Sequence, residues 1–373
     1  MLNGPYRSEG SYRGGGLAVL PGPIKATPRP GRISGTRIAG LAVSHSDEAL
    51  SQAQVLERLG LTGDEFAEGI FARCGVQTRH LSLDGDFLAR TLRGRSNQVE
   101  QELLDHSIRA VEALALDPRR IGTVISASLY SLGVPTLAHR LVEHFEMDPT
   151  TDKYHVAGVG CASGVPLMRL AGQAMHEHPD KHALVVAAES MSSLFTRATP
   201  KDPRAKTVGA AIFGDGCAAA VLSRDPRAEG PVILASQVHQ IGASLGAVSL
   251  DNSGADSYLH LARELPDLAG AGLPEVVGRF LHTHALEHAD IEHWIVHPGG
   301  RRIIENVQNA LELTREDLAT SWDALADHGN IGTPSILYVL KDTIERCEPQ
   351  PGERGLMVTI GPGVTIGLML LGG

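Results

Sequence analysis

Short apolar runs rich in β-branched residues alternate with amphipathic stretches from Arg37 to the C-terminus, and this alternation restricts the fold more than any other feature. Runs of strand length, such as residues 121–127, precede segments such as residues 164–176, whose apolar positions recur at helical spacing. Alternating strands and helices predict an α/β protein. The predicted strands are residues 38–43, 121–127, 182–188, 216–222, 232–237, 294–297, 355–359 and 364–371, and the main predicted helices are residues 98–114, 164–176, 268–284 and 301–311.

Residues 1–36 differ from the rest of the chain, because they are rich in Gly, Pro, Arg and Ser and have no sustained apolar period. We expect them to form a flexible N-terminal extension. The remainder carries a faint internal repeat, since each half contains a strand near a candidate reactive residue, a following helix and a late pair of strands flanked by glycine. This pattern is compatible with two fused copies of one unit, residues 37–225 and 226–373.

Charge and hydropathy exclude several classes of partner. The net charge is −10 and the pI is about 5.9, so the chain has no overall basic field to attract nucleic acid or anionic lipid. No apolar run reaches the ~20 residues that span a bilayer, and the N-terminus has no signal-peptide pattern. The four cysteines lie far apart, which argues against a disulfide framework and a zinc site. We expect a cytoplasmic protein that binds neither nucleic acid nor membranes.

Cys161 lies among small residues, in the sequence Val159-Gly160-Cys161-Ala162-Ser163-Gly164. Residues 155–160 are typical of the end of a buried strand, and residues 165–175 have a helical period, so the thiol is expected at the N-terminus of a helix. Unpaired N–H groups at that position favour negative charge and lower a cysteine pKa from ~8.5 towards neutrality. Two interpretations remain open from this motif alone, a nucleophile or a buried structural thiol.

Two later segments carry further candidate reactive residues. His297 ends a short predicted strand and precedes a Pro-Gly-Gly turn, while Asn330 follows Gly329 in a turn before the helical run of residues 336–344. Both residues also have a structural interpretation: the histidine as a side chain with its hydrogen bonds satisfied at the end of a strand, and the asparagine as a residue of a left-handed turn. Cys, His and Asn at the ends of separate elements can converge in one catalytic site.

With the segment Ile212-Phe213-Gly214-Asp215-Gly216 and the late turn Gly361-Pro362-Gly363, these motifs resemble the chalcone-synthase-like type III polyketide synthases of bacterial type, within the thiolase and ketosynthase superfamily. The resemblance runs from about Ala39 to Gly373. It implies a thiolase fold, with five αβαβα layers built from two related halves and the active site at their junction. It also implies a homodimer, in which a residue near Val134 reaches the cavity of the neighbouring subunit.

The resemblance also implies the chemistry. Cys161 would take an acyl group from a starter acyl-CoA, and His297 would pair with its thiolate. His297 and Asn330 would then donate hydrogen bonds to the thioester oxygen of malonyl-CoA and stabilise the enolate formed by loss of carbon dioxide, at about 3–4 kcal/mol for each donor. These steps need no metal, redox cofactor or carrier protein, and the sequence offers no cluster of metal ligands.

Several positions match the substrate-binding residues of the family. Phe213 matches the phenylalanine that borders the CoA tunnel, and Arg73 matches one of the basic residues that contact CoA phosphates. The cavity positions carry Leu194, Leu250, Leu259 and Gly332 where plant members carry threonine, glycine, phenylalanine and serine. The Gly361-Pro362-Gly363 turn is kept, although Ile360 replaces the aromatic residue before it. Leu250 is expected to form the cavity floor and to limit the product to one to three extensions, and three residues are expected to be structural: His155, Cys217 and His328.

Two alternatives to a polyketide synthase remain. A ketosynthase III of fatty-acid initiation has the same Cys, His and Asn, but it usually has a different sequence after the histidine and a basic face for its carrier protein. His297-Pro298-Gly299-Gly300 favours the polyketide synthase family. The third interpretation is a catalytically silent relative that binds acyl-CoA or serves as a scaffold.

Overall fold

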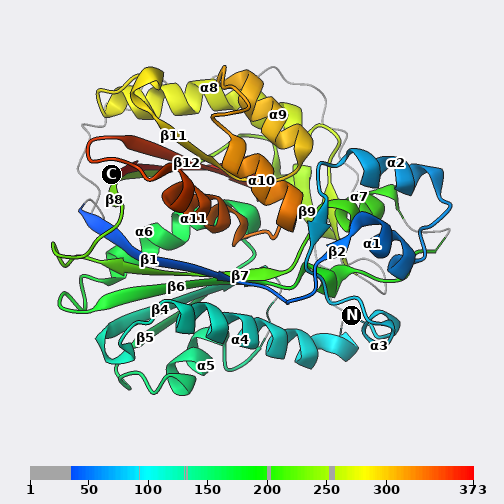
Figure 1. The fold of residues 1–373 in the computed structure, drawn as a ribbon, viewed down its shortest axis with the longest axis horizontal. Coiled ribbons are helices and arrows are strands. Elements are labelled where there is room, and N and C mark those ends of the chain that lie inside the picture. Colours follow the sequence, from blue (N-terminus) through cyan, green and yellow to red (C-terminus); the bar gives the residue numbers. More distant parts are fainter. Residues whose placement is uncertain (1–34, 92, 130, 132, 200–202, 252–256) are drawn as a thin grey trace, which may run out of the picture.

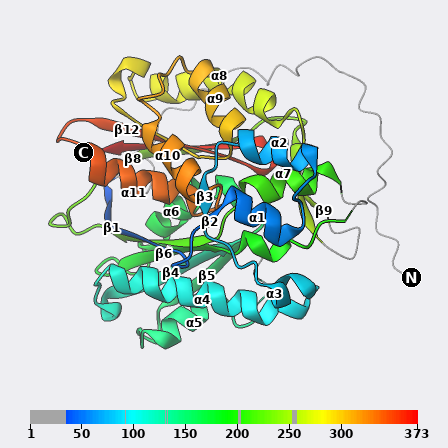
Figure 2. The ribbon, with the colours of Figure 1, turned by 45° about the vertical axis from the view of Figure 1, so that its right-hand side comes forward.

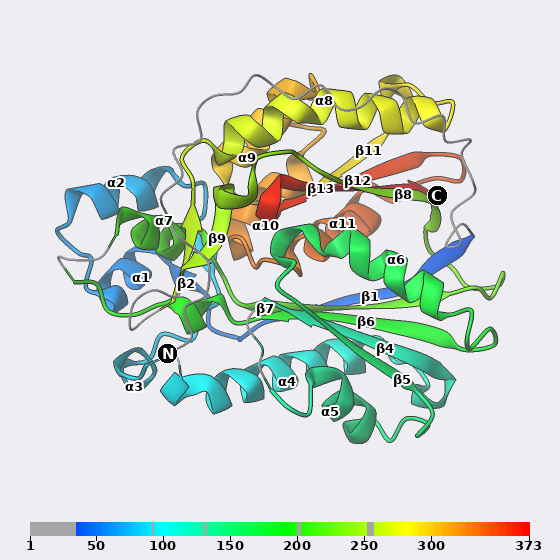
Figure 3. The same cartoon turned by 180° about the vertical axis from the view of Figure 1, so that it is seen from behind.

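The computed structural model describes residues 35–91, 93–129, 131, 133–199, 203–251 and 257–373. Five layers of secondary structure are stacked in the order αβαβα (Figure 1). Helices α4 and α5 cover one outer face, α6 and α11 lie between the two sheet layers, and α8 and α9 cover the opposite outer face (Figures 1 and 3). The bounds of these helices are α4 Ser96–Ala113, α5 Leu137–His144, α6 Gly164–Ala174, α8 Leu265–Thr283, α9 Arg301–Ala310 and α11 Ser335–Cys347.

The two sheet layers are parts of one nine-stranded sheet with the order β11-β12-β13-β8-β1-β7-β6-β4-β5. Only two residue pairs, Thr36 with Ile233 and Arg37 with Val232, join β1 to β8. Beyond this short junction the layers diverge and enclose α6 and α11 (Figure 3). The strands are β1 Thr36–Ser44, β4 Ile121–Ser128, β5 Asp152–Ala157, β6 His182–Glu189, β7 Gly216–Ser223, β8 Val232–Gln240, β11 His293–Val296, β12 Arg354–Gly361 and β13 Thr365–Gly372.

The faint internal repeat of the sequence corresponds to a repeated topology. In the first half β4 runs parallel to β6, and β6, β7 and β1 are successively antiparallel. In the second half β11 runs parallel to β12, and β12, β13 and β8 are successively antiparallel. The chain order also matches, since β1-α4-β4-α6-β6-β7 corresponds to β8-α8-β11-α11-β12-β13. The fold expectation of five layers built from two related halves is confirmed.

The middle strands are buried along their whole length because helices cover both of their faces. Every residue of β4 and β7 is buried. The outer helix α4 turns its apolar stripe of Val99, Leu103 and Val111 inward, where the helix contacts β1 and β7. The spacing of apolar residues along the sequence therefore decides which faces of the strands and helices are buried against one another.

Two expectations need correction. Residues 155–160 do not end a buried strand, because β5 stops at Ala157 and pairs only with β4 at the sheet edge, where Tyr154 is 42 % exposed. Of the predicted flexible extension, residues 1–34 lie outside the described residues, and Thr36 already belongs to β1. Within the described residues, none of the helices combines the length and the apolar character that a membrane crossing requires.

A group of smaller elements lies beside one end of the sheet layers (Figure 2). Helix α7 contacts α2 and β10 there. These elements, with the remaining ones, are β2 Leu50–Ser51, α1 Gln52–Leu59, α2 Glu65–Arg73, β3 Thr78–Arg79, α3 Gly85–Ala89, α7 Arg204–Ile212, β9 Val248–Asp251, β10 Tyr258–Leu261 and α10 Ala319–His328.

Candidate active site

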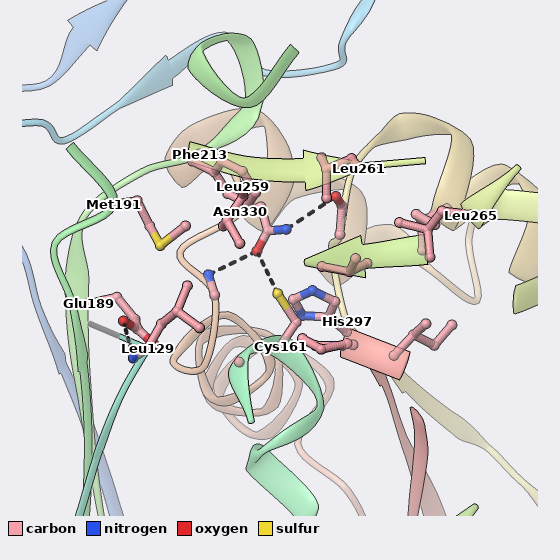
Figure 4. Close-up of a pocket in the computed structure, with 18 residues that line it drawn as sticks. Leu129, Cys161, Glu189, Met191, Phe213, Leu259, Leu261, Leu265, His297 and Asn330 are labelled. Carbon is pink, nitrogen blue, oxygen red and sulfur yellow. Dashed lines mark hydrogen bonds between the residues drawn. The ribbon is translucent and has the colours of Figure 1, made fainter. Parts of the chain in front are cut away.

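A cavity lies where the two halves meet, and Cys161, His297 and Asn330 all line it (Figure 4). Its wall is mostly apolar and draws on both halves. The other lining residues are Leu129, Gly160, Glu189, Met191, Phe213, Val248, Leu259, Leu261, Leu265, Gly299, Ile303, Gly332, Ile360, Gly361 and Pro362. Three motifs that are far apart in the sequence therefore converge as expected.

Cys161 sits in a single 3-10 turn, Gly160–Ala162, that leads directly into α6. Gly160 has a φ of +59°, in the left-handed region that favours glycine. The backbone of Gly361 presses on the same turn, because a Cβ at Gly361 would lie 2.3 Å from the amide nitrogen of Ala162. The glycine of the late turn is therefore required for close packing behind the cysteine.

His297 follows the last residue of β11, and its N–H donates to the carbonyl of Val358 at 2.9 Å. The side chain is 1 % exposed, and neither ring nitrogen has a hydrogen-bond partner among the described residues. Gly299 packs against the ring, since a Cβ there would lie 3.2 Å from Cδ2. Figure 4 shows the imidazole beside the sulfur of Cys161. Burial lowers the pKa of His297 to about 3, so the ring is neutral at pH 7.

Asn330 is held through its backbone and its side chain. Its N–H donates to the carbonyl of Ile212 at 2.7 Å, and its carbonyl accepts from the N–H of Gly214 at 3.1 Å. Its Oδ1 accepts from the N–H of Gly332 at 2.9 Å, and its Nδ2 donates to the carbonyl of Gly299 at 3.2 Å. These two bonds fix the orientation of the amide, and the second hydrogen of Nδ2 is available to a ligand.

The thiol of Cys161 donates to Oδ1 of Asn330 at 3.7 Å. Burial raises the pKa of Cys161 to about 12, although the hydrogen bond with Asn330 opposes this shift, and the charge of Glu189 adds to it. The expected lowering of this pKa by a helix N-terminus is therefore wrong for the resting site, because burial outweighs the helix and the neutral His297 supplies no positive charge. A proton transfer from sulfur to imidazole would create both charges together, and their attraction is strong in a buried site.

Glu189 is a buried residue of the cavity that the sequence analysis missed. It ends β6, is 2 % exposed, and accepts hydrogen bonds from the N–H of Leu129 at 2.8 Å and the hydroxyl of Thr333 at 2.8 Å. Burial raises its pKa to about 7. The signal was a single acidic residue at the end of an otherwise apolar strand.

Comparison with known families decides the identity of the chain. A model described as FAE1/type III polyketide synthase-like protein matches residues 44–253, more than half of the chain, and a model of the C-terminal domain of chalcone and stilbene synthases matches residues 235–373. The chain belongs to the type III polyketide synthase family. It is a condensing enzyme of the acyltransferase type, in a family that acts on acyl-CoA and malonyl-CoA.

Individual relatives agree with this family. The chain is 30 % identical to the 3,5-dihydroxyphenylacetyl-CoA synthase of Streptomyces toyocaensis, over 98 % of this chain and 94 % of that protein. It is 32 % identical to the 1,3,6,8-tetrahydroxynaphthalene synthase of Streptomyces peucetius subsp. caesius, over 80 % and 81 % of the two chains. The crystal structure of PKS-I from the brown alga Ectocarpus siliculosus matches with a TM-score of 0.82 at 24 % identity, over 90 % of this chain and 98 % of that one, and it supports the fold. The ketosynthase III and silent-relative alternatives receive no such support.

The cavity of this polyketide synthase differs in part from the expected one. Five expected positions line it: Phe213, Leu259, Gly332, Gly361 and Pro362. Three do not: Leu194, which is packed in the core, Gly363, which turns the chain at a φ of +64°, and Leu250. Val134 is exposed at the surface, and its expected contact with the cavity of a neighbouring subunit stays a prediction.

Leu250 is absent from the residues that line this cavity, and its expected role as the cavity floor stays a prediction. The β9–β10 hairpin pairs Leu261 with Val248 and Leu259 with Leu250, and only the last of these four side chains is absent from the cavity wall. Leu250 lies one step beyond Val248 along β9, next to the end of that strand. The wall of this polyketide synthase is instead completed by Leu129, Met191 and Leu261, which the sequence analysis did not select.

Arg73 is exposed in the last turn of α2 and does not line the cavity. Its side chain lies along the helix, because a Cβ at Gly69 would be 3.0 Å from Nη2 of Arg73. Its contact with CoA phosphates stays a prediction. All four cysteines belong to the described residues and carry free thiols, as expected.

Proposed function

We propose that Cys161, His297 and Asn330 are the catalytic residues of this type III polyketide synthase. The observation that carries the proposal is their convergence in one buried cavity, with the Cys161 sulfur 3.7 Å from Oδ1 of Asn330 and the His297 ring beside it. In the loading step, His297 takes the thiol proton and the sulfur attacks the carbonyl carbon of the acyl-CoA. The new carbon–sulfur bond forms as the bond to CoA breaks, and the proton leaves with the CoA thiol.

In the condensation step, His297 and Asn330 donate hydrogen bonds to the thioester oxygen of malonyl-CoA. The carbon–carboxylate bond breaks, carbon dioxide leaves, and the electron pair remains as an enolate. The enolate carbon then attacks the acyl carbon on Cys161 and displaces the sulfur. Support comes from the fixed amide of Asn330, whose Nδ2 has a hydrogen to spare, and from the apolar wall, beside which hydrogen bonds to a developing charge are strong. These steps use no metal or redox cofactor.

We infer an aliphatic acyl starter. The inference rests on the wall of the cavity, where the side chains around the thiol are mainly leucine, isoleucine and methionine. Such a wall favours apolar chains and offers an aromatic starter few polar partners.

The experiment supplies malonyl-CoA with a panel of acyl-CoA thioesters, with and without an acyl carrier protein, and identifies the products by mass spectrometry. We expect products from CoA thioesters alone. A strict requirement for the carrier protein would indicate a ketosynthase III instead. A folded protein that turns over no thioester in the panel would indicate a silent relative.

The residues that line the cavity predict which substitution lengthens the product. Met191 lines the cavity and is buried, so Met191→Ala should enlarge it and lengthen the product by at least one extension. Leu250→Ala is the matched control, because Leu250 lies on the hairpin outside the wall and should leave product length unchanged. Product lengths are measured by mass spectrometry. A longer product from Leu250→Ala, with an unchanged product from Met191→Ala, would show that Leu250 forms the cavity floor.

We propose that the enzyme is a homodimer and that Val134 lies in its interface. Val134 is an apolar side chain that is 90 % exposed in the isolated subunit. Two described residues that precede it are held in place, because Glu100 on α4 accepts hydrogen bonds from the N–H of Gly133 at 2.9 Å and the hydroxyl of Ser131 at 3.0 Å. An exposed apolar residue beside such held groups is suited to a self-complementary interface.

Light scattering should therefore give twice the chain mass of 39.5 kDa at micromolar concentration. Val134→Asp should shift the equilibrium towards the monomer, because a charge would be buried in the interface. Leu245→Asp is the control, since Leu245 is also apolar and exposed. A monomeric mass for the unmodified protein would contradict the proposal.

A further inference from the structure

Three histidines gather outside the catalytic cavity, and each comes from a different segment. His45 follows β1, His80 follows β3, and His328 ends α10. Each offers a ring nitrogen, and these nitrogens lie within 4.8 Å of one another. None of the three residues lines the cavity. We propose that this histidine cluster is a binding site for one divalent transition-metal ion, with Zn²⁺ as the probe.

In His45 and His80, a hydrogen bond engages Nδ1 and leaves Nε2 free to bind a metal ion. Nδ1 of His45 lies 3.0 Å from the carbonyl of Ser46, and Nδ1 of His80 lies 3.1 Å from the carbonyl of Glu48. A carbonyl only accepts, so Nδ1 carries the hydrogen in both rings and Nε2 presents a lone pair. Metal-binding histidines are usually oriented in this way, by a backbone carbonyl on the other nitrogen.

The third ring adds an unsatisfied nitrogen. Nδ1 of His328 is buried and has no hydrogen-bond partner in the described part of the chain. A buried orphan nitrogen is costly unless a ligand completes it.

A fourth histidine is close by but is already engaged. His106 interacts electrostatically with His45 and His80, and its Nδ1 lies 2.7 Å from Nη2 of Arg109. The guanidinium can only donate, so Nε2 of His106 carries its hydrogen and is unsuitable as a ligand. The cluster therefore supplies three imidazoles, and water would complete a tetrahedral zinc shell.

Binding requires one rearrangement. The rings of His45 and His80 are stacked, with centroids 3.7 Å apart and an angle of 23° between their planes. Because a lone pair lies in its ring plane, the His45 ring must rotate out of the stack and give up its bond to Ser46, while His80 keeps its bond to Glu48, for both to point at a common ion. His45 is partly exposed, so its ring can turn without a large change in packing.

The ion would link segments that support the catalytic site. His328 precedes Gly329 and Asn330, and the carbonyl of His80 accepts from the N–H of Asp215 at 2.8 Å, two residues after Phe213. A Cβ at Gly329 would lie 2.6 Å from the carbonyl of Ile212, so this region has little room to relax. We therefore expect a stabilising metal behind the active site, with no part in the chemistry. The expectation that the chain offers no ligand cluster missed it, because the three histidines come together only in the fold.

The experiment uses the full chain without an affinity tag, freed of metal by a chelator and then titrated with Zn²⁺ by calorimetry. We expect saturable binding of one ion for each chain and a melting temperature that rises with Zn²⁺. His45→Phe keeps an aromatic ring for the stack but has no ligand nitrogen, and His328→Ala removes the orphan nitrogen. Each should lower zinc affinity at least tenfold and abolish the rise in melting temperature.

His282→Ala is the matched control, because His282 is exposed on α8, and it should bind zinc as the unmodified protein does. The melting shift is measured for each variant with and without zinc, so a variant that is less stable still gives a result. Substitution of Co²⁺ should produce visible absorption of a tetrahedral site. Absence of saturable binding in the unmodified protein, or equal affinity in His45→Phe, His328→Ala and the control, would overturn the proposal.

Discussion

Cys161→Ala should abolish polyketide formation and leave the decarboxylation of malonyl-CoA measurable. The sulfur is the group that holds the growing acyl chain, so its loss removes the acyl-enzyme and every condensation that depends on it. The donors to the enolate are His297 and Asn330, and the backbone bonds that hold them do not involve Cys161. Product formation and release of acetyl-CoA are measured in the same reaction by mass spectrometry.

Cys347→Ala is the matched control, because Cys347 is an exposed free thiol at the end of α11 and does not line the cavity. It should retain both activities. Polyketide formation by Cys161→Ala at the rate of the unmodified enzyme would remove Cys161 as the nucleophile. Loss of decarboxylation together with condensation would show that the two roles are not separable.

Asn330→Ala should lower the rate of malonyl-CoA decarboxylation by about 10²–10³-fold, the usual effect of removing one donor to a developing oxyanion. The amide orientation supports this size of effect, because Oδ1 is held by Gly332 and Nδ2 by Gly299, so the spare hydrogen is already fixed before substrate binds. The rate is measured as release of acetyl-CoA from malonyl-CoA.

Asn330→Asp distinguishes the role of the Asn330 side chain as a hydrogen-bond donor from its role in holding the backbone of Gly332. The aspartate keeps an oxygen for the N–H of Gly332 but has no N–H to offer, so its rate should fall with that of the alanine variant. Asn309→Ala changes an exposed asparagine of α9 and should have no effect. An unchanged decarboxylation rate in Asn330→Ala, with an unchanged melting temperature, would refute the assigned role.

Local patterns account for what could be predicted from the sequence. The longer helices and the buried strands of the large sheet follow from apolar periods of the neighbouring residues, so their positions were predicted to within a few residues, whereas several shorter helices were not predicted. The Cys161, His297 and Asn330 turns were also recognisable, because each consists of a few adjacent residues with glycine. Gly160 and Gly329 have positive φ, and Gly361 touches the cysteine turn, so these glycines are fixed by local geometry and close packing.

Contacts between distant segments decided the rest. The exposure of Tyr154 depends on the absence of a second neighbour for β5, and the place of Leu250 depends on how the β9–β10 hairpin crosses the cavity wall. The raised pKa of Cys161 depends on burial by both halves, which the helix period cannot reveal.

The sequence by itself determined the order of strands and helices and the three reactive turns, since both depend on residues that are close along the chain. Only the tertiary structure decided the cavity wall, the buried carboxyl of Glu189 and the cluster of His45, His80 and His328. Each of these depends on side chains from remote segments, and their distances and solvent exposure are set when the five layers pack together.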